Sequence, residues 1–310
     1  MNYQFKLEGL KTPRGTISIR ALQLLVNTLT ETSERGLRLA VQGESVKRGP
    51  IPGWLARSLD FTVTGIKKGS TTILLEAPPL GETAPDQIKQ QDLWFTKPTP
   101  EDTAITLVGR SVKEVISRNF ESYAYDEGVL EGLLSFETFF KTYATKLTVQ
   151  ANGRPAEKFS LNSMVLEKVR ELKTEIPEPI ATVIAGKFDL IQYSGPRFHL
   201  LLSDCHTILG TIDRDILNVE DMRKFWGKKV TIKGVLHFHP GRKIKLLEAQ
   251  SITLAKEGEE VFERLPSPGK PVTLFDLEIQ KLNANPALKE IWGKWPGDES
   301  IEELLAALTP

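Results

Sequence analysis

The chain has a single cysteine, Cys205, among its 310 residues. One thiol excludes an intramolecular disulfide framework and a zinc site built from several cysteines, and it suits a reducing compartment. No uncharged apolar run approaches the roughly 18 residues needed to cross a bilayer, and the N-terminus has no apolar signal core. We therefore expect a cytoplasmic protein that makes no membrane contact.

The chain also lacks net charge, with 40 basic residues against 40 acidic ones. No overall field would draw it to nucleic acid or to an anionic membrane. The distribution is uneven: residues 1–177 carry 23 basic and 21 acidic residues, residues 178–254 carry 11 and 8, and residues 255–310 carry 6 and 11. The segment net charges of +2, +3 and −5 mean that a polyanion would meet the middle segment first.

Recognisable catalytic motifs are missing as well. There is no glycine-rich phosphate loop, no Gly-x-Ser-x-Gly elbow and no His-Glu-x-x-His pair. Cys205 stands between Asp204 and His206, but adjacent residues in a tight turn point apart and do not form a nucleophile–base contact. We therefore predict no catalytic residues, no cofactor and no resident metal, and we expect a protein that is not an enzyme.

The residues that are present are typical of a folded protein with several domains. Hydrophobic residues make up 40% and charged residues 26% of the chain, close to the globular average. A length of 310 residues favours two or three domains. The predicted fold class is α+β multidomain: an N-terminal α+β domain, a helical middle region, a C-terminal five-stranded β-barrel and an acidic tail.

Hydrophobic periodicity places the first elements. Residues 3–7 alternate as a strand, residues 22–29 carry the stripe of an amphipathic helix, residues 37–41 alternate again, and residues 61–75 have the pattern of a hairpin. This succession predicts an α+β domain over residues 1–77. Five of the 19 prolines lie between Pro78 and Pro100, and proline continues neither a helix nor a central strand, so we predict a linker over residues 78–105.

Helical spacing returns after the proline-rich stretch. Hydrophobic stripes over 112–123, 129–140 and 161–173 predict three helices and a mainly helical region over residues 106–177. Seven aromatic residues between Phe120 and Tyr143 could line a groove for a partner. At helical spacing they favour a hydrophobic core instead.

From residue 178 to residue 254 the hydrophobic period is two, in runs at 179–193, 197–203, 206–212, 229–238 and 242–253. The polar interruption at 213–228 predicts a short helix that stops at Gly227. On one face of this helix lie Val219, Met222 and either Phe225 or Trp226. In the fourth run, which begins at Lys229, alternate residues such as Val230 would face a core. Three strands, a helix and two strands follow the chain order of the oligonucleotide-binding (OB) fold, which residues 178–254 resemble.

An OB-like barrel implies a ligand surface across its second and third strands, rimmed by the loops that join strands one to two and four to five. Cations there would contact phosphates and flat side chains would stack on bases. The residues implied as nucleic-acid-binding are Tyr193, Arg197, His199, Lys233, His237, His239, Arg242, Lys243 and Lys245. The stacking surface is poor, because the outward positions expected on strand two are His199 and Leu201. The pattern does not distinguish DNA from RNA.

Two smaller patterns have alternative interpretations. His237-x-His239 would point two imidazoles the same way from one strand and could seat a metal, although no carboxylate is obviously placed as a further ligand. The loop at 45–53 combines Lys47 and Arg48 with glycine and proline, and could hold a phosphate. Strands and solvated loops with no such role look the same.

Residues 255–310 form the predicted acidic tail, with a last helix at 301–308. Ser300 and Glu303 have the spacing of a capping box, but a helix of two turns is too short to be stable alone. The segment resembles the acidic partner-docking tails of small bacterial antitoxin-type proteins, which implies a protein partner for residues 286–310. The residues implied in partner contact are Trp292, Trp295, Ile301, Leu304 and Leu305. Packing of the tail onto the chain itself is the other interpretation.

The leading functional hypothesis is a non-enzymatic binding protein whose barrel contacts single-stranded or structured nucleic acid. The alternative is a protein-interaction or regulatory subunit, of the bacterial defence or toxin–antitoxin type, that docks through the barrel and the tail. The basic barrel loops favour the first. Neutral net charge, weak stacking and the tail favour the second.

Overall fold

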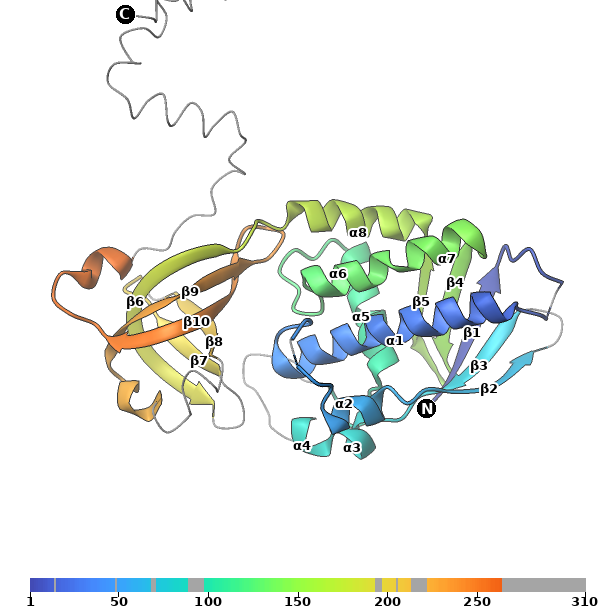
Figure 1. The fold of residues 1–310 in the computed structure, drawn as a ribbon, viewed down its shortest axis with the longest axis horizontal. Coiled ribbons are helices and arrows are strands. Elements are labelled where there is room, and N and C mark those ends of the chain that lie inside the picture. The colour runs from blue at the N-terminus through green and yellow to red at the C-terminus, as the bar shows by residue number, and fades with distance from the viewer. Residues whose placement is uncertain are drawn as a thin grey trace, which may run out of the picture. The chain divides into compact units, whose positions relative to one another are not determined.

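The computed structural model describes residues 1–13, 15–47, 49–67, 71–88, 98–192, 197–204, 206–212 and 222–263, without the side chains of 154–156, 190–192 and 260–261. These residues belong to one unit that spans residues 1–266. It contains two large hydrophobic cores, one in residues 1–176, which we call the body, and one in residues 180–254, which we call the barrel (Figure 1). The α+β fold class with a closed C-terminal barrel is confirmed.

The body is built on an antiparallel five-stranded sheet with the strand order β2-β3-β1-β4-β5. Its strands are β1 (Asn2–Glu8), β2 (Thr62–Lys67), β3 (Thr72–Glu76), β4 (Lys146–Ala151) and β5 (Arg154–Asn162). On the central strand β1, Tyr3, Phe5 and Leu7 are buried and Lys6 between them is exposed. Because strand side chains alternate between faces, one face of the sheet carries the core and the other is polar.

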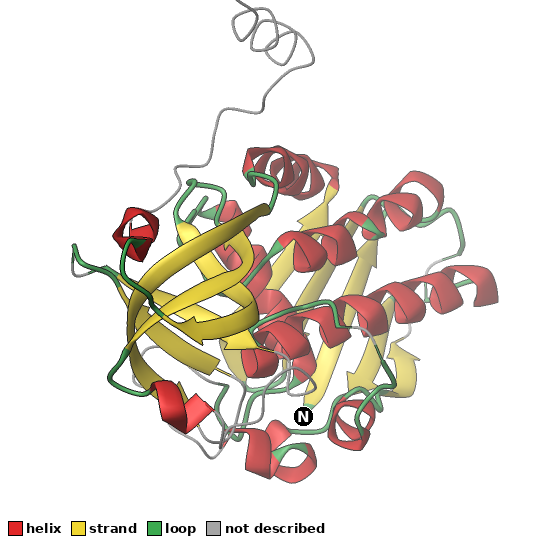
Figure 2. Ribbon diagram, turned by 60° about the vertical axis from the view of Figure 1, so that its left-hand side comes forward, coloured by secondary structure: helices red, strands yellow, loops and turns green. Residues whose placement is uncertain are grey.

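Helices cover the apolar face of this sheet (Figure 2). The helices of the body are α1 (Ile19–Gln42), α2 (Gly53–Ser58), α3 (Leu80–Thr83), α4 (Pro85–Ile88), α5 (Ala104–Ile116), α6 (Glu127–Leu134), α7 (Phe136–Thr142) and α8 (Ser163–Glu175). Of these, α2, α3 and α4 pack in a smaller cluster with the end of α1 and not in the core that the sheet shares. Leu25 and Leu29 of α1, Val112 of α5 and Val169 of α8 share the core with the strands. Burying such a side chain contributes about 1.5–3 kcal/mol, so this core stabilises the body.

Helix α1 is longer than the periodicity predicted. The strand expected at 37–41 is wrong, because α1 continues to Gln42 and ends at Gly43, whose φ of 87° is the left-handed conformation of a helix C-cap. Leu39 joins the main core, while Leu37 packs in a second small cluster with Leu55. The last turns of α1 are thus buried on two sides. Such a helix does not show the single stripe of hydrophobic residues by which an amphipathic helix is recognised in a sequence.

The described part of the proline-rich stretch packs against other parts of the body. Leu80 is fully buried, and the backbone N–H groups of Leu80 and Gly81 donate to the carbonyls of Asp102 and Pro100 over 2.8 Å. Prolines 79 and 85 lie at the starts of α3 and α4, where a missing N–H has no cost. Residues 89–97 of the expected linker lie outside the described residues.

The middle region contains a hairpin that the sequence analysis missed. Strands β4 and β5 lie between α7 and α8, and β4 pairs with β1 in the register Phe5↔Val149. The sheet therefore combines strands from residues 1–77 and residues 106–177, and one core serves both ranges. The stripe expected over 112–123 ends at Ile116, so Phe120 and Tyr123 lie in the following loop. The division into independently folding domains stays a prediction.

The barrel follows the predicted runs closely. Its strands are β6 (Ile180–Gln192), β7 (Arg197–Leu201), β8 (Thr207–Ile212), β9 (Lys229–Phe238) and β10 (Ile244–Leu254), closed in the order β10-β8-β7-β6-β9. Only the β8–β10 pair is parallel among the described strand pairs. Three consecutive strands followed by a fourth that returns beside the first make the Greek-key order of an OB-like barrel, which the segment therefore has.

Close packing explains why the barrel closes. Phe188 and Phe198 stack with ring centroids 4.9 Å apart, and both are fully buried with Leu200 and Val230. Gly210 makes room for this pair, since a Cβ at that position would lie 2.1 Å from the Phe198 ring. A small residue opposite a large one is how a narrow barrel fills its interior.

Of the predicted helix at 213–228, the described part is the turn η1 (Arg223–Phe225). Met222 and Phe225 both pack on the barrel core, as expected for residues that share a face, whereas Trp226 is 66% exposed. Gly227 has φ 71°, as expected for a stop. After β10 a second turn, η2 (Glu259–Glu263), follows, and residues 264–310, including the five predicted partner-contact residues of the tail, lie outside the described residues.

Candidate functional site

The OB-like ligand face meets the body in this structure. Arg197 at the start of β7 donates from Nη2 to the carbonyl of Val41 in α1 over 3.2 Å. Arg197 and His199 are each only 8% exposed. Phe198 and Leu200 fill the barrel core and His199 does not, as expected for an outward position, but that position is not open to solvent.

Lys245 of β10, expected to face outward from the barrel, lies against the body and not in solvent. Its ammonium lies 3.4 Å from Oδ2 of Asp126, and the two side chains are 10% and 16% exposed. Asp126 is at the same time the N-cap of α6, accepting from the Val129 N–H over 2.9 Å, and it accepts from the Ser45 N–H over 3.1 Å. Burial, the largest influence, raises the pKa of Asp126, but the charge of Lys245 and these hydrogen bonds outweigh it and leave the pKa lowered.

The loop between β9 and β10 contacts the body through two further residues. Lys243 forms an ion pair with Glu121, and the ring of His239 lies edge-on to Tyr123 with centroids 5.2 Å apart. His239 is 4% exposed, and no described residue lies within hydrogen-bond distance of its Nε2. Burial, and then the charge of Lys245, lower the pKa of His239 to about 4, so the ring is neutral near pH 7.

Three predicted nucleic-acid residues remain exposed: Lys233, Arg242 and Lys243, the last of which forms the ion pair with Glu121. Lys233 on β9 and Arg242 in the β9–β10 loop both face solvent, and Arg242 has φ 62°, a left-handed conformation that a non-glycine residue adopts in tight turns. His237 is half-buried and its Nε2 lies 3.1 Å from Glu248 Oε2. Tyr193 lies outside the described residues. The predicted set is thus divided between contacts with the body and exposed positions.

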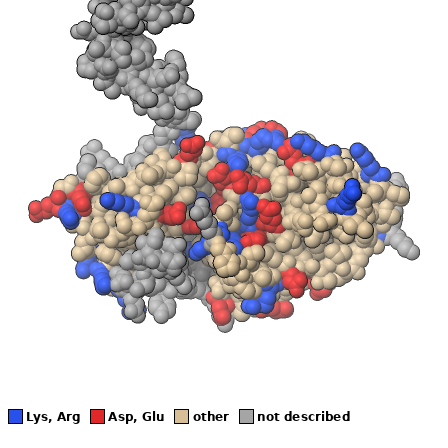
Figure 3. Space-filling model, in the orientation of Figure 1, with Lys and Arg blue, Asp and Glu red and all other residues tan. Residues whose placement is uncertain are grey.

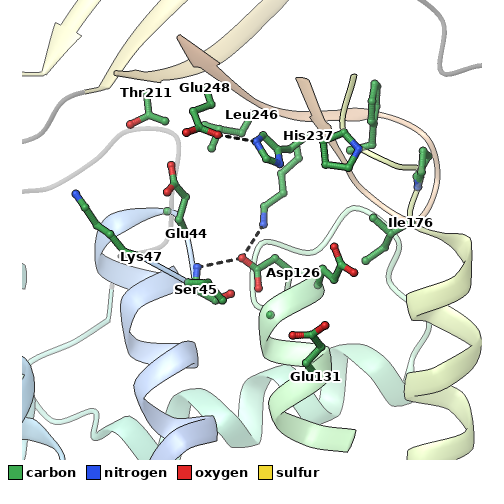
Figure 4. Close-up of a pocket in the computed structure, with 18 of the residues that line it drawn as sticks. Glu44, Ser45, Lys47, Asp126, Glu131, Ile176, Thr211, His237, Leu246 and Glu248 are labelled. Atoms are coloured by element: carbon green, nitrogen blue, oxygen red, sulfur yellow. Dashed lines mark hydrogen bonds and ion pairs between the residues drawn. The ribbon is translucent and has the colours of Figure 1, made fainter. Parts of the chain in front are cut away.

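A cleft of about 590 Å³ opens where the barrel meets the body (Figure 4). Barrel strands β8, β9 and β10 form one wall, and the end of α1 with the start of α6 forms the other. The charged residues that line it are Glu44, Lys47, Asp126, Glu127, Glu131, Lys245 and Glu248, with His237 beside them. A second cavity of about 450 Å³ at the same junction is lined by apolar residues such as Leu39 and Leu209. The charged residues that also line it are Arg110, Lys113, Glu114, Glu121, Arg197 and Lys245.

Negative charge dominates the larger cleft, which is therefore called the acidic cleft. Glu131 is compensated by Arg35 and Lys173, at 3.1 and 2.7 Å. Glu44 extends from the end of α1 toward Glu248 in Figure 4. Burial raises the pKa of Glu44, and the carboxylate of Glu248 raises it further. Facing carboxylates repel phosphate groups, so the acidic cleft is unsuited to a nucleic-acid backbone.

The acidic cleft has no recognisable metal or catalytic arrangement in the described part of the chain. No group of three His, Cys, Asp or Glu side chains is placed to hold a metal ion there. The predicted His237-x-His239 pair does not converge, because His237 bonds to Glu248 while His239 packs on Tyr123. In the loop at 45–53, for which phosphate binding was one interpretation, the backbone N–H of Ser45 donates to the Asp126 carboxylate.

The sequence analysis missed the body residues that receive the barrel. Asp126 and Glu121 lie in a range expected to be helical, and nothing in their spacing marks them as partners of Lys245 and Lys243. One signal for nucleic-acid binding could have been recognised in the sequence. The segment from Arg223 to Lys229 is RKFWGKK, an aromatic pair between basic residues.

The described helices include none that is long and apolar enough to span a bilayer. Comparison with known proteins adds little: no family model matches the chain, and no curated protein does. A solved structure of replication protein A from U. maydis bound to ssDNA is 16% identical, over 38% of this chain and 88% of that chain, with a TM-score of 0.18. A TM-score this low carries no argument, so the likeness to the OB fold stands on the strand order and closure of the barrel.

Proposed function

We propose that this protein binds nucleic acid, and that its OB-like barrel contacts single-stranded or structured DNA or RNA. The observation that carries the proposal is the closed β10-β8-β7-β6-β9 barrel, an architecture whose members commonly bind oligonucleotides. The barrel segment has a charge surplus of +3, and exposed cations such as Lys233 and Arg242 remain on it. Positive charge on an exposed barrel surface supports contact with phosphates.

The test is fluorescence anisotropy of the full chain with labelled oligonucleotides of about 20 nucleotides, a length that covers the site of one OB fold. Single-stranded DNA, single-stranded RNA, a hairpin and a duplex are compared. Three phosphate contacts on a single strand predict binding about twentyfold weaker at about 200 mM than at about 50 mM salt. The proposal fails if no oligonucleotide binds at micromolar protein, or if binding is insensitive to salt.

A second candidate is a protein-interaction subunit that docks through the barrel and residues 286–310. The observation that favours it is the net charge of −5 over residues 255–310, which include Trp292 and Trp295. A chain lacking residues 286–310 is compared with the full chain in a pull-down. Equal recovery of the same partner by both chains would contradict docking through the tail.

A further inference from the structure

Trp226 presents a large flat ring to solvent at the η1 end of the barrel. It is 66% exposed, whereas Met222 and Val230 on either side of it in sequence are buried. The indole Nε1 donates to the carbonyl of Asp189 on β6 over 2.7 Å. An exposed tryptophan whose polar atom is already bonded to a strand is held in place, so its ring surface is available at low entropic cost.

The backbone around the ring is fixed as well. The Gly227 N–H donates to the Phe188 carbonyl over 2.7 Å, and the Phe188 N–H donates to the Lys228 carbonyl over 2.9 Å. Phe225 packs inward on the ring of Phe188, with centroids 6.3 Å apart. Because Phe188 belongs to the barrel core, these contacts tie the segment to the most rigid part of the barrel.

Cations lie close to Trp226 in the chain and on the strand that accepts its indole N–H. Arg223, Lys228 and, on the neighbouring strand, Lys187 are exposed, and no ion-pair partner is seen for them among the described residues. Figure 3 shows basic side chains over the η1 part of the barrel. Residues 213–221 lie outside the described part, and their sequence contains four carboxylates and one guanidinium. The salt dependence of oligonucleotide binding shows whether the cations or the carboxylates dominate the interaction.

The η1 end is remote from the surface that contacts the body. Lys229 begins β9 and Phe238 ends it, next to the loop that packs on Tyr123. A strand of ten residues spans about 30 Å at the usual rise per residue. A ligand at the η1 end would therefore not compete with the body for Arg197 or Lys245.

We propose that Trp226, with Arg223, Lys228 and Lys187, forms the single-strand-binding site of this protein. A base stacks on the indole and the cations contact the flanking phosphates, the combination by which proteins hold single strands without reading sequence. Cores of protein–protein interfaces are depleted in lysine, so the lysines around Trp226 favour nucleic acid over a protein partner. This inference rests on the proposed function and places it at the η1 end.

The experiment measures anisotropy of the full chain with fluorescein-labelled oligothymidine and oligouridine. Trp226→Leu keeps an apolar side chain but removes the flat ring, and we expect binding to weaken about five- to 150-fold, the cost of losing one stacked base. Trp226→Phe keeps a ring and restores most of the affinity. Thermal melting of each variant verifies that it is folded.

Arg223→Glu with Lys228→Glu removes two phosphate contacts, so the log–log salt slope becomes shallower by about 1.4. The matched control is Arg20→Glu with Lys158→Glu, exposed residues of the body with the same change in net charge. The control leaves the slope unchanged. A second comparison, Lys233→Glu with Arg242→Glu, tests the part of the barrel first predicted from the sequence.

The outcomes separate the two proposals. If the wild-type chain binds and the Trp226 and Arg223/Lys228 variants bind equally well, the site is overturned and the proposed function stands. If only the charge variants weaken binding, the surface is a polyanion patch without stacking, and the site is again overturned. If polyglutamate displaces the oligonucleotide as well as unlabelled oligothymidine does, the same conclusion holds. If the wild-type chain binds no oligonucleotide, both proposals fail.

Discussion

His239 is one of the barrel residues first predicted to contact nucleic acid, and its pKa is strongly lowered. Its imidazole is 4% exposed, and its pKa is lowered to about 4 from 6.5 by burial and by Lys245. The folded protein therefore binds fewer protons at this group than the unfolded chain between pH 6.5 and pH 4. Stability must rise with pH across that window and be lost as the pH falls through it.

We predict that the free energy of unfolding falls by about 2 kcal/mol from pH 7 to pH 5 through His239 alone, given a pKa of about 4. His239→Leu removes the titrating group, so its stability falls less over the same interval. Urea unfolding at both pH values measures the difference. Tyr123→Leu, which takes away the ring beside the imidazole, should reduce the pH dependence partway; equal dependence in all three proteins would show that His239 is not desolvated.

At the scale of the element, Gly43 both ends α1 and accommodates the barrel. Its φ of 87° suits glycine, and a Cβ there would lie 2.9 Å from Nη2 of Arg197. The same residue thus terminates the helix and lets the Arg197 guanidinium reach the carbonyl of Val41. Helix end and barrel contact are coupled at one position.

A left-handed conformation costs a non-glycine residue about 1–2 kcal/mol. We predict that Gly43→Ala lowers the free energy of unfolding by more than this amount. Arg197 must also move, which weakens the contact between barrel and body. The control is Gly153→Ala, where φ is 76° and no atom lies within 4 Å of the added Cβ. Chemical denaturation compares the two variants, and equal losses would mean that Arg197 gives way freely.

The elements also divide into those that periodicity predicts and those that it does not. The five barrel runs matched β6 to β10 because each strand has one buried face, as in Val230, Ile232 and Leu236 of β9. The end of α1 was taken for a strand because Leu37 and Leu39 are both buried, in different clusters. Hydrophobic periodicity identifies an element correctly when one of its sides is buried, and it fails for an element that is buried on two sides.

At the scale of the whole molecule, Asp126 and Lys245 join the barrel to the body. Both are largely buried, and Asp126 also caps α6 and bonds to Ser45. Removing one member of such a pair leaves the other as an uncompensated buried charge, which usually costs about 3–5 kcal/mol. Loss of the pair should therefore destabilise both the barrel and the body.

We predict that Asp126→Asn and Lys245→Met each destabilise the protein by about 3 kcal/mol, and that the double variant is more stable than the sum of the single losses implies. Asparagine keeps the N-cap, so the cycle isolates the charge pair. Urea unfolding of the four proteins gives the coupling energy. The exposed pair Glu121–Lys243 is the comparison and should show much weaker coupling, because water screens it; equal coupling in the two pairs would contradict the importance of burial.

The sequence by itself determined the barrel, the α+β class and the basic character of the middle segment, because each is written in local periodicity, composition and turns. Only the tertiary structure decided that Arg197 and Lys245 contact the body, that His199 is buried, and that Trp226 faces solvent. Periodicity tells which side of a strand a residue occupies, but what covers that side depends on segments far away in the chain, here Val41 and Asp126. A free surface is a property of the packed molecule and not of the strand that carries it.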